Sequence, residues 1–93
     1  MAESTPFRDN APRGRFELDV DGHTAFADYR RDGDRLSIDH VETPVALRGG
    51  GVAGALMRGV ADQARREGLK VTPICSYAVA WFRRHPDERD LLA

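Results

Sequence analysis

A run of glycines that follows an arginine is the part of this 93-residue chain best suited to bind an anion. Arg48 precedes Gly49, Gly50 and Gly51, and Gly54 follows in a stretch with apolar residues at helical spacing. Glycine lets a ligand approach the main chain closely, and the first turn of a helix presents free N–H groups and the positive end of the helix dipole. These features favour a phosphate group. The sequence leaves one alternative open, a flexible turn that binds nothing.

Residue spacing excludes two common phosphate-binding loops. A P-loop requires Lys and then Ser or Thr after its second glycine, but Ala55 and another apolar residue follow Gly54. Gly49, Gly51 and Gly54 satisfy the pattern Gly-x-Gly-x-x-Gly. That pattern binds a dinucleotide only within a βαβ unit that has an acid about 20 residues further on. Residues 70–76 contain no acid, so the dinucleotide interpretation fails.

Cys75 and His40 are the side chains best suited to catalysis. Cys75, the single cysteine, ends a short apolar run before a predicted helix, where the helix dipole favours a thiolate. The alternative is that it packs as a small apolar residue. His40 ends a predicted strand on the face of Leu36 and Ile38, so we expect it to point towards the interior near the glycines. It is suited to be a general base or a hydrogen-bonded core histidine, and no metal-ligand cluster accompanies it.

Strands, a loop and helices must position these groups. Alternation of apolar and polar residues predicts three strands, over residues 15–20, 23–31 and 35–41. Asp-Gly pairs separate them, and such pairs are typical of two-residue hairpins, so the strands form an antiparallel meander. After the glycine loop we expect a helix that ends at Gly68, a strand from Lys70 to Cys75, and a helix that Ser76 caps and Pro86 stops. The predicted fold class is α+β.

Length and composition indicate one ordinary globular domain. The chain is 41% hydrophobic and 31% charged, with a net charge of −1. Residues 1–14 show no periodicity and are predicted to form a disordered tail, which leaves 15–93 as the domain. No apolar run reaches the roughly 20 residues of a membrane span, the first residues show no apolar segment of the signal-peptide kind, and Cys75 has no second cysteine to pair with. We therefore expect a cytoplasmic monomer that binds neither a membrane nor nucleic acid.

Charge is distributed unevenly along the chain. Residues 15–45 carry four arginines and eight acids, a balance of −4, whereas residues 46–86 carry seven basic residues and two acids, a balance of +5. One interpretation is that the half with the glycines meets an anion while the other half attracts a cation. The other is that both are solvated faces.

Several motifs together resemble those of the GCN5-related N-acetyltransferases. Arg48, Gly51 and Ala53 match the pattern Arg/Gln-x-x-Gly-x-Gly/Ala of the loop that holds the pyrophosphate of coenzyme A in that family. The likeness extends to its small single-domain members through further matches, namely His40 eight residues before Arg48, Cys75-Ser76-Tyr77 and Arg84-His85-Pro86-Asp87. The stretch His40-Val41-Glu42-Thr43 departs from the His-Thr-Glu-Val expected there.

The resemblance implies an acetyl-CoA-dependent N-acetyltransferase that acts on an amine, or alternatively a non-catalytic acyl-CoA or CoA-binding module or protein adaptor. It implies that Cys75 lies beside the thioester as an acyl acceptor or an acid, with Tyr77 as the other candidate acid, and that His40 acts as a base. The helices that shape an acceptor pocket in longer relatives have no counterpart at the Asp21-Gly22 hairpin. The residues implied to bind the cofactor are Val41, Thr43, Arg48, Gly49, Gly50, Gly51, Val52, Ala53, Gly54, Ser76, Tyr77 and Arg84.

Overall fold

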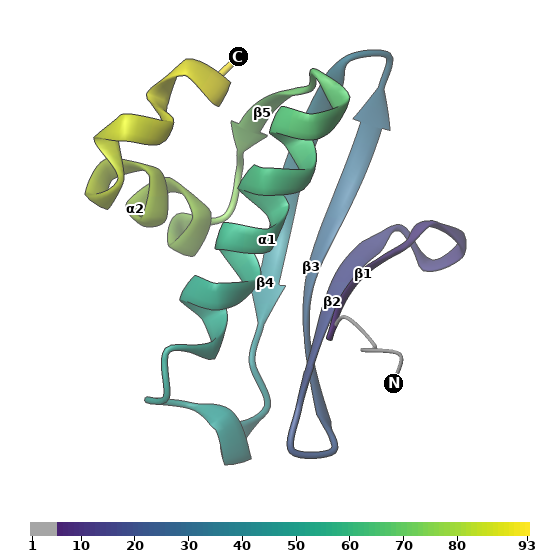
Figure 1. The fold of residues 1–93 in the computed structure, drawn as a ribbon, viewed down its shortest axis with the longest axis vertical. Coiled ribbons are helices and arrows are strands. Elements are labelled where there is room, and N and C mark those ends of the chain that lie inside the picture. Colours follow the sequence, from purple (N-terminus) through teal and green to yellow (C-terminus); the bar gives the residue numbers. More distant parts are fainter. Residues whose placement is uncertain (1–5) are drawn as a thin grey trace.

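Five strands form one mixed sheet, and two helices cover one of its faces (Figure 1). The structure is a computed structural model and describes residues 6–93. The strands lie in the order β1-β2-β3-β4-β5, and only β4 and β5 are parallel neighbours. Their bounds are β1 (Phe7–Asn10), β2 (Arg15–Val20), β3 (His23–Asp32), β4 (Arg35–Glu42) and β5 (Lys70–Pro73), and the helices are α1 (Val52–Glu67) and α2 (Ser76–Arg84). The predicted α+β class and the order from meander to final helix are confirmed.

The local signals in the sequence form the elements that they predicted. Asp21 and Gly22 have φ angles of 51° and 79°, the left-handed conformation that a tight β2–β3 hairpin of this kind requires. Gly68 ends α1 with φ 68°, and its amide bonds the carbonyl of Arg65 at 3.3 Å. The meander and the helix after the loop therefore follow from short-range chemistry.

The core lies between the sheet and the two helices. α1 packs over β2, β3 and β4, and α2 packs over β4 and β5. β3 buries two small side chains, Ala25 and Ala27, whereas its neighbours β2 and β4 bury larger ones. The two alanines leave room for α1. The other buried members of this core are Phe16, Leu18, Leu36, Ile38, Leu56, Met57, Val60, Ala61, Ala64, Leu69, Val71, Ala78, Trp81, Phe82 and Leu91. The opposite face of the sheet carries polar and charged side chains together with Phe26, whose ring lies against the Arg15 guanidinium.

The predicted disordered tail is wrong for the part that the structure describes. Residues 7–10 form β1, which pairs antiparallel with β2, and residues 1–5 lie outside the described residues. Phe7 stacks on Phe16 with ring centroids 5.6 Å apart. It also lies against α1 at Gly59, where a Cβ atom would come within 2.5 Å of the Phe7 ring. β1 has four residues and one apolar side chain, so its sequence shows no periodicity. The contacts that hold it are tertiary and could not be predicted from that stretch.

A β-bulge interrupts β4 and reverses its alternation. Asp28 pairs with His40 but Tyr29 pairs with Ile38, so Asp39 is the extra residue of β4. Ile38 is fully buried on the helix side, and beyond the bulge it is Val41 that packs against the core. His40 is thereby turned to the opposite, open face.

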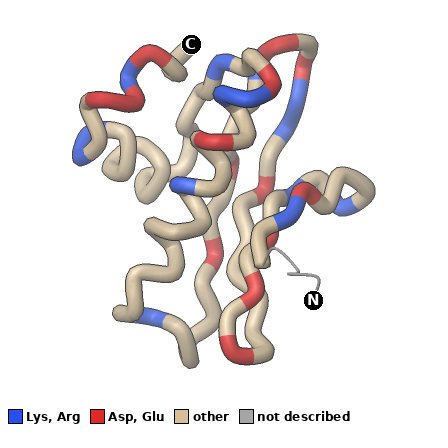
Figure 2. Tube along the Cα trace, viewed as in Figure 1, with Lys and Arg blue, Asp and Glu red and all other residues tan. Residues whose placement is uncertain are grey.

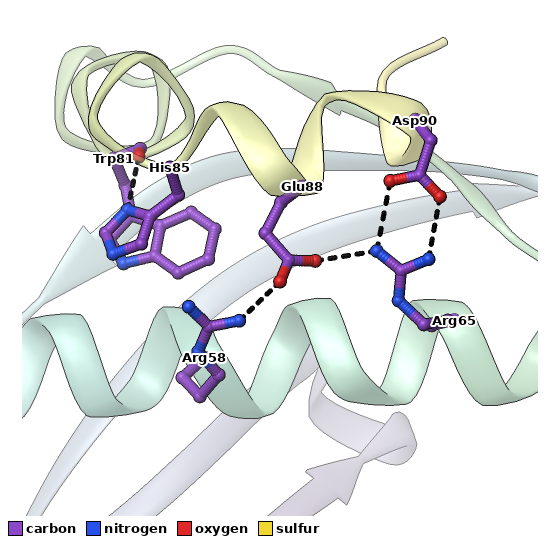
Figure 3. A network of polar contacts seen from close by, with 6 residues as sticks. All are labelled: Arg58, Arg65, Trp81, His85, Glu88 and Asp90. Atoms are coloured by element: carbon purple, nitrogen blue, oxygen red, sulfur yellow. Dashed lines mark hydrogen bonds and ion pairs between the residues drawn. The ribbon is translucent and has the colours of Figure 1, made fainter.

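An ion-pair cluster around one buried carboxylate attaches the C-terminal segment to α1 (Figure 3). The 3₁₀ segment η3 (Pro86–Leu91) carries Glu88, which is only 8% exposed. Its carboxylate accepts hydrogen bonds from Arg58 at 2.5 Å and from Arg65 at 2.7 Å, and Arg65 also bonds Asp90 at 2.7 Å. The hydrogen bond from Arg65 lowers the pKa of Glu88, and the bond and charge of Arg58 add to this effect, whereas burial opposes it.

His85 completes the junction between α2 and η3. Its ring stacks on Trp81 with centroids 4.1 Å apart, and its Nδ1 atom donates to the Trp81 carbonyl at 2.7 Å. His85, which belongs to the Arg-His-Pro-acid ending, is therefore the C-cap residue of α2.

Candidate functional site

The glycine loop borders a hollow of about 240 Å³. It lies where the end of β4, the start of α1 and the start of α2 meet. Its lining consists mainly of main chain and small side chains, and its members are Thr43, Leu47, Arg48, Gly49, Gly51, Val52, Ala53, Gly54 and Tyr77. All of these except Leu47 were predicted as cofactor-binding residues.

The main chain of the loop directs free N–H groups to this region. Gly49 and Gly51 have φ angles of 86° and 78°, a conformation that favours glycine, and no side chain caps α1. The Gly50 amide bonds the Leu47 carbonyl at 3.4 Å. Within residues 6–93 no oxygen accepts a hydrogen bond from the amides of Gly49, Gly51, Val52, Ala53 and Gly54. An uncapped helix start with free amides and the positive dipole end fits a phosphate group.

Arg48 is the one charged residue of the sequence between Glu42 and Arg58. Figure 2 shows the loop before α1 as largely uncharged around an isolated basic segment. Its Nε atom donates to the Thr43 carbonyl at 3.1 Å, and its Nη2 atom lies 3.6 Å from Glu42. The Arg48 side chain is 61% exposed, so a second anion can reach it. The basic half of the sequence adds little else here, because two of its arginines bind Glu88 and Asp90 instead.

Cys75 and Tyr77 approach the site from the start of α2. Cys75, not Ser76, is the N-cap residue: its backbone is extended and its sulfur accepts a hydrogen bond from the Ala78 amide at 3.4 Å. The predicted Ser76 cap is wrong, because Ser76 is already the first helical residue and its side chain is exposed. The Tyr77 hydroxyl reaches α1, and it would lie 3.7 Å from a Cβ atom placed on Gly54.

β4 and β5 separate just beside these residues. Their pairing ends at Ile38 and Pro73, and the Ile38 carbonyl accepts both the Ile74 and Cys75 amides, at 2.9 and 3.2 Å. β4 continues to Glu42, but no described strand pairs with that last part on the β5 side. An extended ligand could therefore lie along β4 between the Cys75 region and the loop.

His40 does not point to the interior, which corrects the expectation from the sequence. The side chain is 56% exposed, its Nε2 atom lies 2.9 Å from a Glu42 carboxylate oxygen, and its ring is 6.3 Å from that of Phe26. Cys75 packs against the core on the helix side of the sheet, so the fold does not bring these two side chains to one face. The bulge at Asp39 is the physical reason, and alternation alone could not predict it.

Four residues predicted to bind the cofactor do not line the hollow, namely Val41, Gly50, Ser76 and Arg84. Val41 packs against the core, and the amide of Gly50 is occupied within the loop. Arg84 is exposed at the far end of α2, about 12 Å from Ser76 by helical rise. Leu47 also lines the hollow but was not predicted. It is 8% exposed, and its apolar side chain directly before Arg48 was the only signal in the sequence.

Glu42 was missed as well. It contacts both His40 and Arg48, so it links the end of β4 to the glycine loop. No group of three or more potential metal ligands gathers within residues 6–93. The same residues include no helix long and apolar enough to cross a membrane.

The chain is similar to one protein family and to solved structures. A family model described as GCN5-related N-acetyl-transferase matches residues 15–91. The solution structure of a GCN5-like candidate N-acetyltransferase from Staphylococcus aureus has a TM-score of 0.69 and 23% sequence identity. The similarity covers 98% of this chain and 91% of that one, and at this identity it establishes the fold. Among curated proteins, none matches the sequence.

Proposed function

Because the chain belongs to the GCN5-related N-acetyltransferase family, we propose that it transfers an acetyl group from acetyl-CoA to a primary amine. The observation that carries the proposal is the set of free amides at residues 49 and 51–54, next to a solvent-accessible arginine. These amides would hold the pyrophosphate of the cofactor, and Arg48 would add a positive charge.

Val41, Thr43, Cys75 and Tyr77 would contact the cofactor beyond its pyrophosphate. The backbone of Val41 and Thr43 would hydrogen-bond the pantetheine arm, since β4 lacks a strand partner there on the β5 side in the described chain. Acetyl-CoA supplies an activated thioester carbonyl. Fixing the pyrophosphate and the arm at two places would confine the acetyl group near Cys75 and Tyr77, and this positioning would supply most of the rate.

Proton transfer would involve Cys75, Tyr77 and His40. Tyr77 lines the hollow and its hydroxyl reaches α1, so it is well placed to donate a proton to the departing thiolate. Cys75 would either share that role or accept the acetyl group before the amine does. His40 would act as the base that takes a proton from the amine, from the open face of β4, where its Nε2 atom lies 2.9 Å from a Glu42 carboxylate oxygen.

The second candidate is a module that binds CoA or an acyl-CoA without turnover. It is favoured by the position of His40, which faces away from Cys75. In this case the loop and Arg48 keep their roles, and the amine site is lacking.

Two measurements test the proposal and separate it from the second candidate. Calorimetry with CoA measures binding, and a thiol reagent measures CoA release from acetyl-CoA with peptides that have free N-termini, lysine peptides and polyamines. The transferase is supported if the wild type binds CoA and releases CoA from acetyl-CoA with an amine, and if Cys75→Ser or Tyr77→Phe reduces that release. If CoA binds but no amine in the panel causes release of CoA from acetyl-CoA, the result supports the module. Absence of binding at high CoA concentration refutes both candidates. Intact mass after incubation with acetyl-CoA alone shows whether a group of about 42 Da is attached to Cys75.

A further inference from the structure

A second hollow, of about 370 Å³, lies between α2, η3 and β5 and shares no residue with the glycine-loop hollow. Its lining is Pro73, Val79, Phe82, Arg83, Pro86, Arg89 and Leu92. We call this lining the C-terminal groove. Its volume lies at the lower end of the range of about 300–1,000 Å³ typical of ligand pockets.

The floor of the C-terminal groove is apolar. Five of its seven lining residues are apolar, and they come from three elements. Ile74, the neighbour of Pro73, is 54% exposed and is one of only two large apolar side chains that are exposed within residues 6–93. Apolar surface gathered in one place in this way is typical of a contact with another molecule.

Two arginines without partners accompany this apolar floor. Arg83 belongs to the last turn of α2 and Arg89 to η3, and neither side chain forms an ion pair or hydrogen bond with any described residue. Arg58 and Arg65, which lie close by on α1, are bound to Glu88 instead. No acidic residue lines the groove. The lining therefore complements a ligand that is both apolar and negatively charged.

The outer edge of β5 cannot accept another strand beside the groove. Pro73 has no N–H group, and the Val71 carbonyl already accepts the Ala93 amide at 2.9 Å. Leu92 forms a bridge with Val71 at the same edge. A peptide would therefore bind through its side chains, which is how a helix lies in a groove.

We propose that the C-terminal groove binds an acidic amphipathic helix of another protein. Apolar side chains of that helix would pack against Val79, Pro86 and Leu92. Its Asp or Glu carboxylates would form paired hydrogen bonds with the guanidinium groups of Arg83 and Arg89. Arginine is among the residue types that most often dominate binding energy at interfaces. This site is independent of acetyl transfer, because it shares no residue with the glycine-loop hollow.

Fluorescence anisotropy with two labelled peptides tests the proposal on the full chain. One peptide has about twelve residues, three turns of helix, with leucine at helical spacing and glutamate elsewhere; the other has lysine in place of glutamate. We expect the glutamate peptide to bind at least about tenfold more tightly than the lysine peptide, and added salt to weaken it. Equal binding of the two peptides, or binding of neither, overturns the proposal.

Charge-reversal variants locate the binding. Arg83→Glu and Arg89→Glu should each weaken the glutamate peptide about tenfold. Arg13→Glu is the matched control, since Arg13 is also exposed and without a partner in the described chain but lies in the segment between β1 and β2. A control that weakens binding as much as the groove variants contradicts the assignment. CoA binding and the thermal unfolding midpoint, measured on each variant, show that the fold is intact.

Two other occupants give distinguishable results. If a second copy of this chain fills the groove, sedimentation shows a wild-type dimer that Arg83→Glu dissociates, and the peptide proposal is overturned. If a free anionic lipid fills it, dodecanoate below its micellar concentration displaces an environment-sensitive probe from the groove while the glutamate peptide does not, which also overturns it. Displacement by the glutamate peptide from a monomeric protein supports it.

Discussion

Glu88→Gln tests whether the ion-pair cluster holds the C-terminal segment on α1. The substitution keeps the shape of the side chain and removes its charge. In the wild type the carboxylate is 8% exposed and accepts from Arg58 and Arg65 at 2.5 and 2.7 Å. Glutamine can accept one of these hydrogen bonds with its single oxygen and would place an N–H group opposite the other guanidinium.

The structure sets the size of the expected effect. A hydrogen bond to a charged group contributes about 1.5–3 kcal/mol. Two are affected, but Arg58 and Arg65 are 42% and 47% exposed and water can replace part of the loss. Arg65 also keeps its contact with Asp90. We therefore expect a loss of about 2 kcal/mol in unfolding free energy from Glu88→Gln, which corresponds to a fall of about 8–16 °C in Tm.

Thermal unfolding followed by circular dichroism at two pH values measures this effect. The pKa of Glu88 is lowered in the folded state, chiefly by Arg65, so its contribution is present above the unfolded-state value of 4.5 and is lost as the pH falls through the folded value. The difference between wild type and variant should therefore be large at about pH 7 and small at about pH 3. Asp87→Asn is the matched control, because Asp87 is exposed and has no described partner. Equal midpoints at neutral pH, or a gap that persists unchanged in acid, would refute the reasoning.

Three further predictions concern the loop, the N-terminal strand and the helix cap. Gly51→Ala should destabilise the fold by about 1–2 kcal/mol in urea unfolding, because φ is 78°, whereas Gly54→Ala should cost less since its Cβ meets only the Tyr77 hydroxyl at 3.7 Å. Gly59→Ala should lower the unfolding free energy by about 1–3 kcal/mol through the clash with Phe7, although alanine favours helix. The same substitution in a Phe7→Ala background should be neutral or stabilising. An equal loss in both backgrounds contradicts the contact. Cys75→Ser should keep the N-cap, and Cys75→Ala should lose about 1 kcal/mol in the same assay; identical stability of the two variants would argue against a capping role.

Short-range patterns predicted most of the fold because turns, caps and helical periodicity act over a few residues. The Asp21-Gly22 hairpin and the end of α1 at Gly68 are examples. β1 was not predictable in this way, because its stability depends on Phe7 meeting Phe16 and a helix that begins at Val52. No window of sequence contains that contact.

The candidate site shows the same division. The glycines and Arg48 were predictable because their conformations and charge belong to one continuous stretch. The orientation of His40 was not, since a single extra residue at Asp39 reverses the face of everything that follows in β4. The Glu88 cluster was also missed, because Arg58 and Glu88 are 30 residues apart and no local pattern joins them.

A CoA titration followed by backbone amide NMR tests the central claim most directly. If the pyrophosphate is held by the uncapped start of α1, the amide signals of Gly49, Gly51, Val52, Ala53 and Gly54 should shift together with CoA. Pantetheine, which lacks the pyrophosphate, should leave them in place at equal concentration. Amides that do not respond to CoA, or that respond equally to pantetheine, would contradict the account.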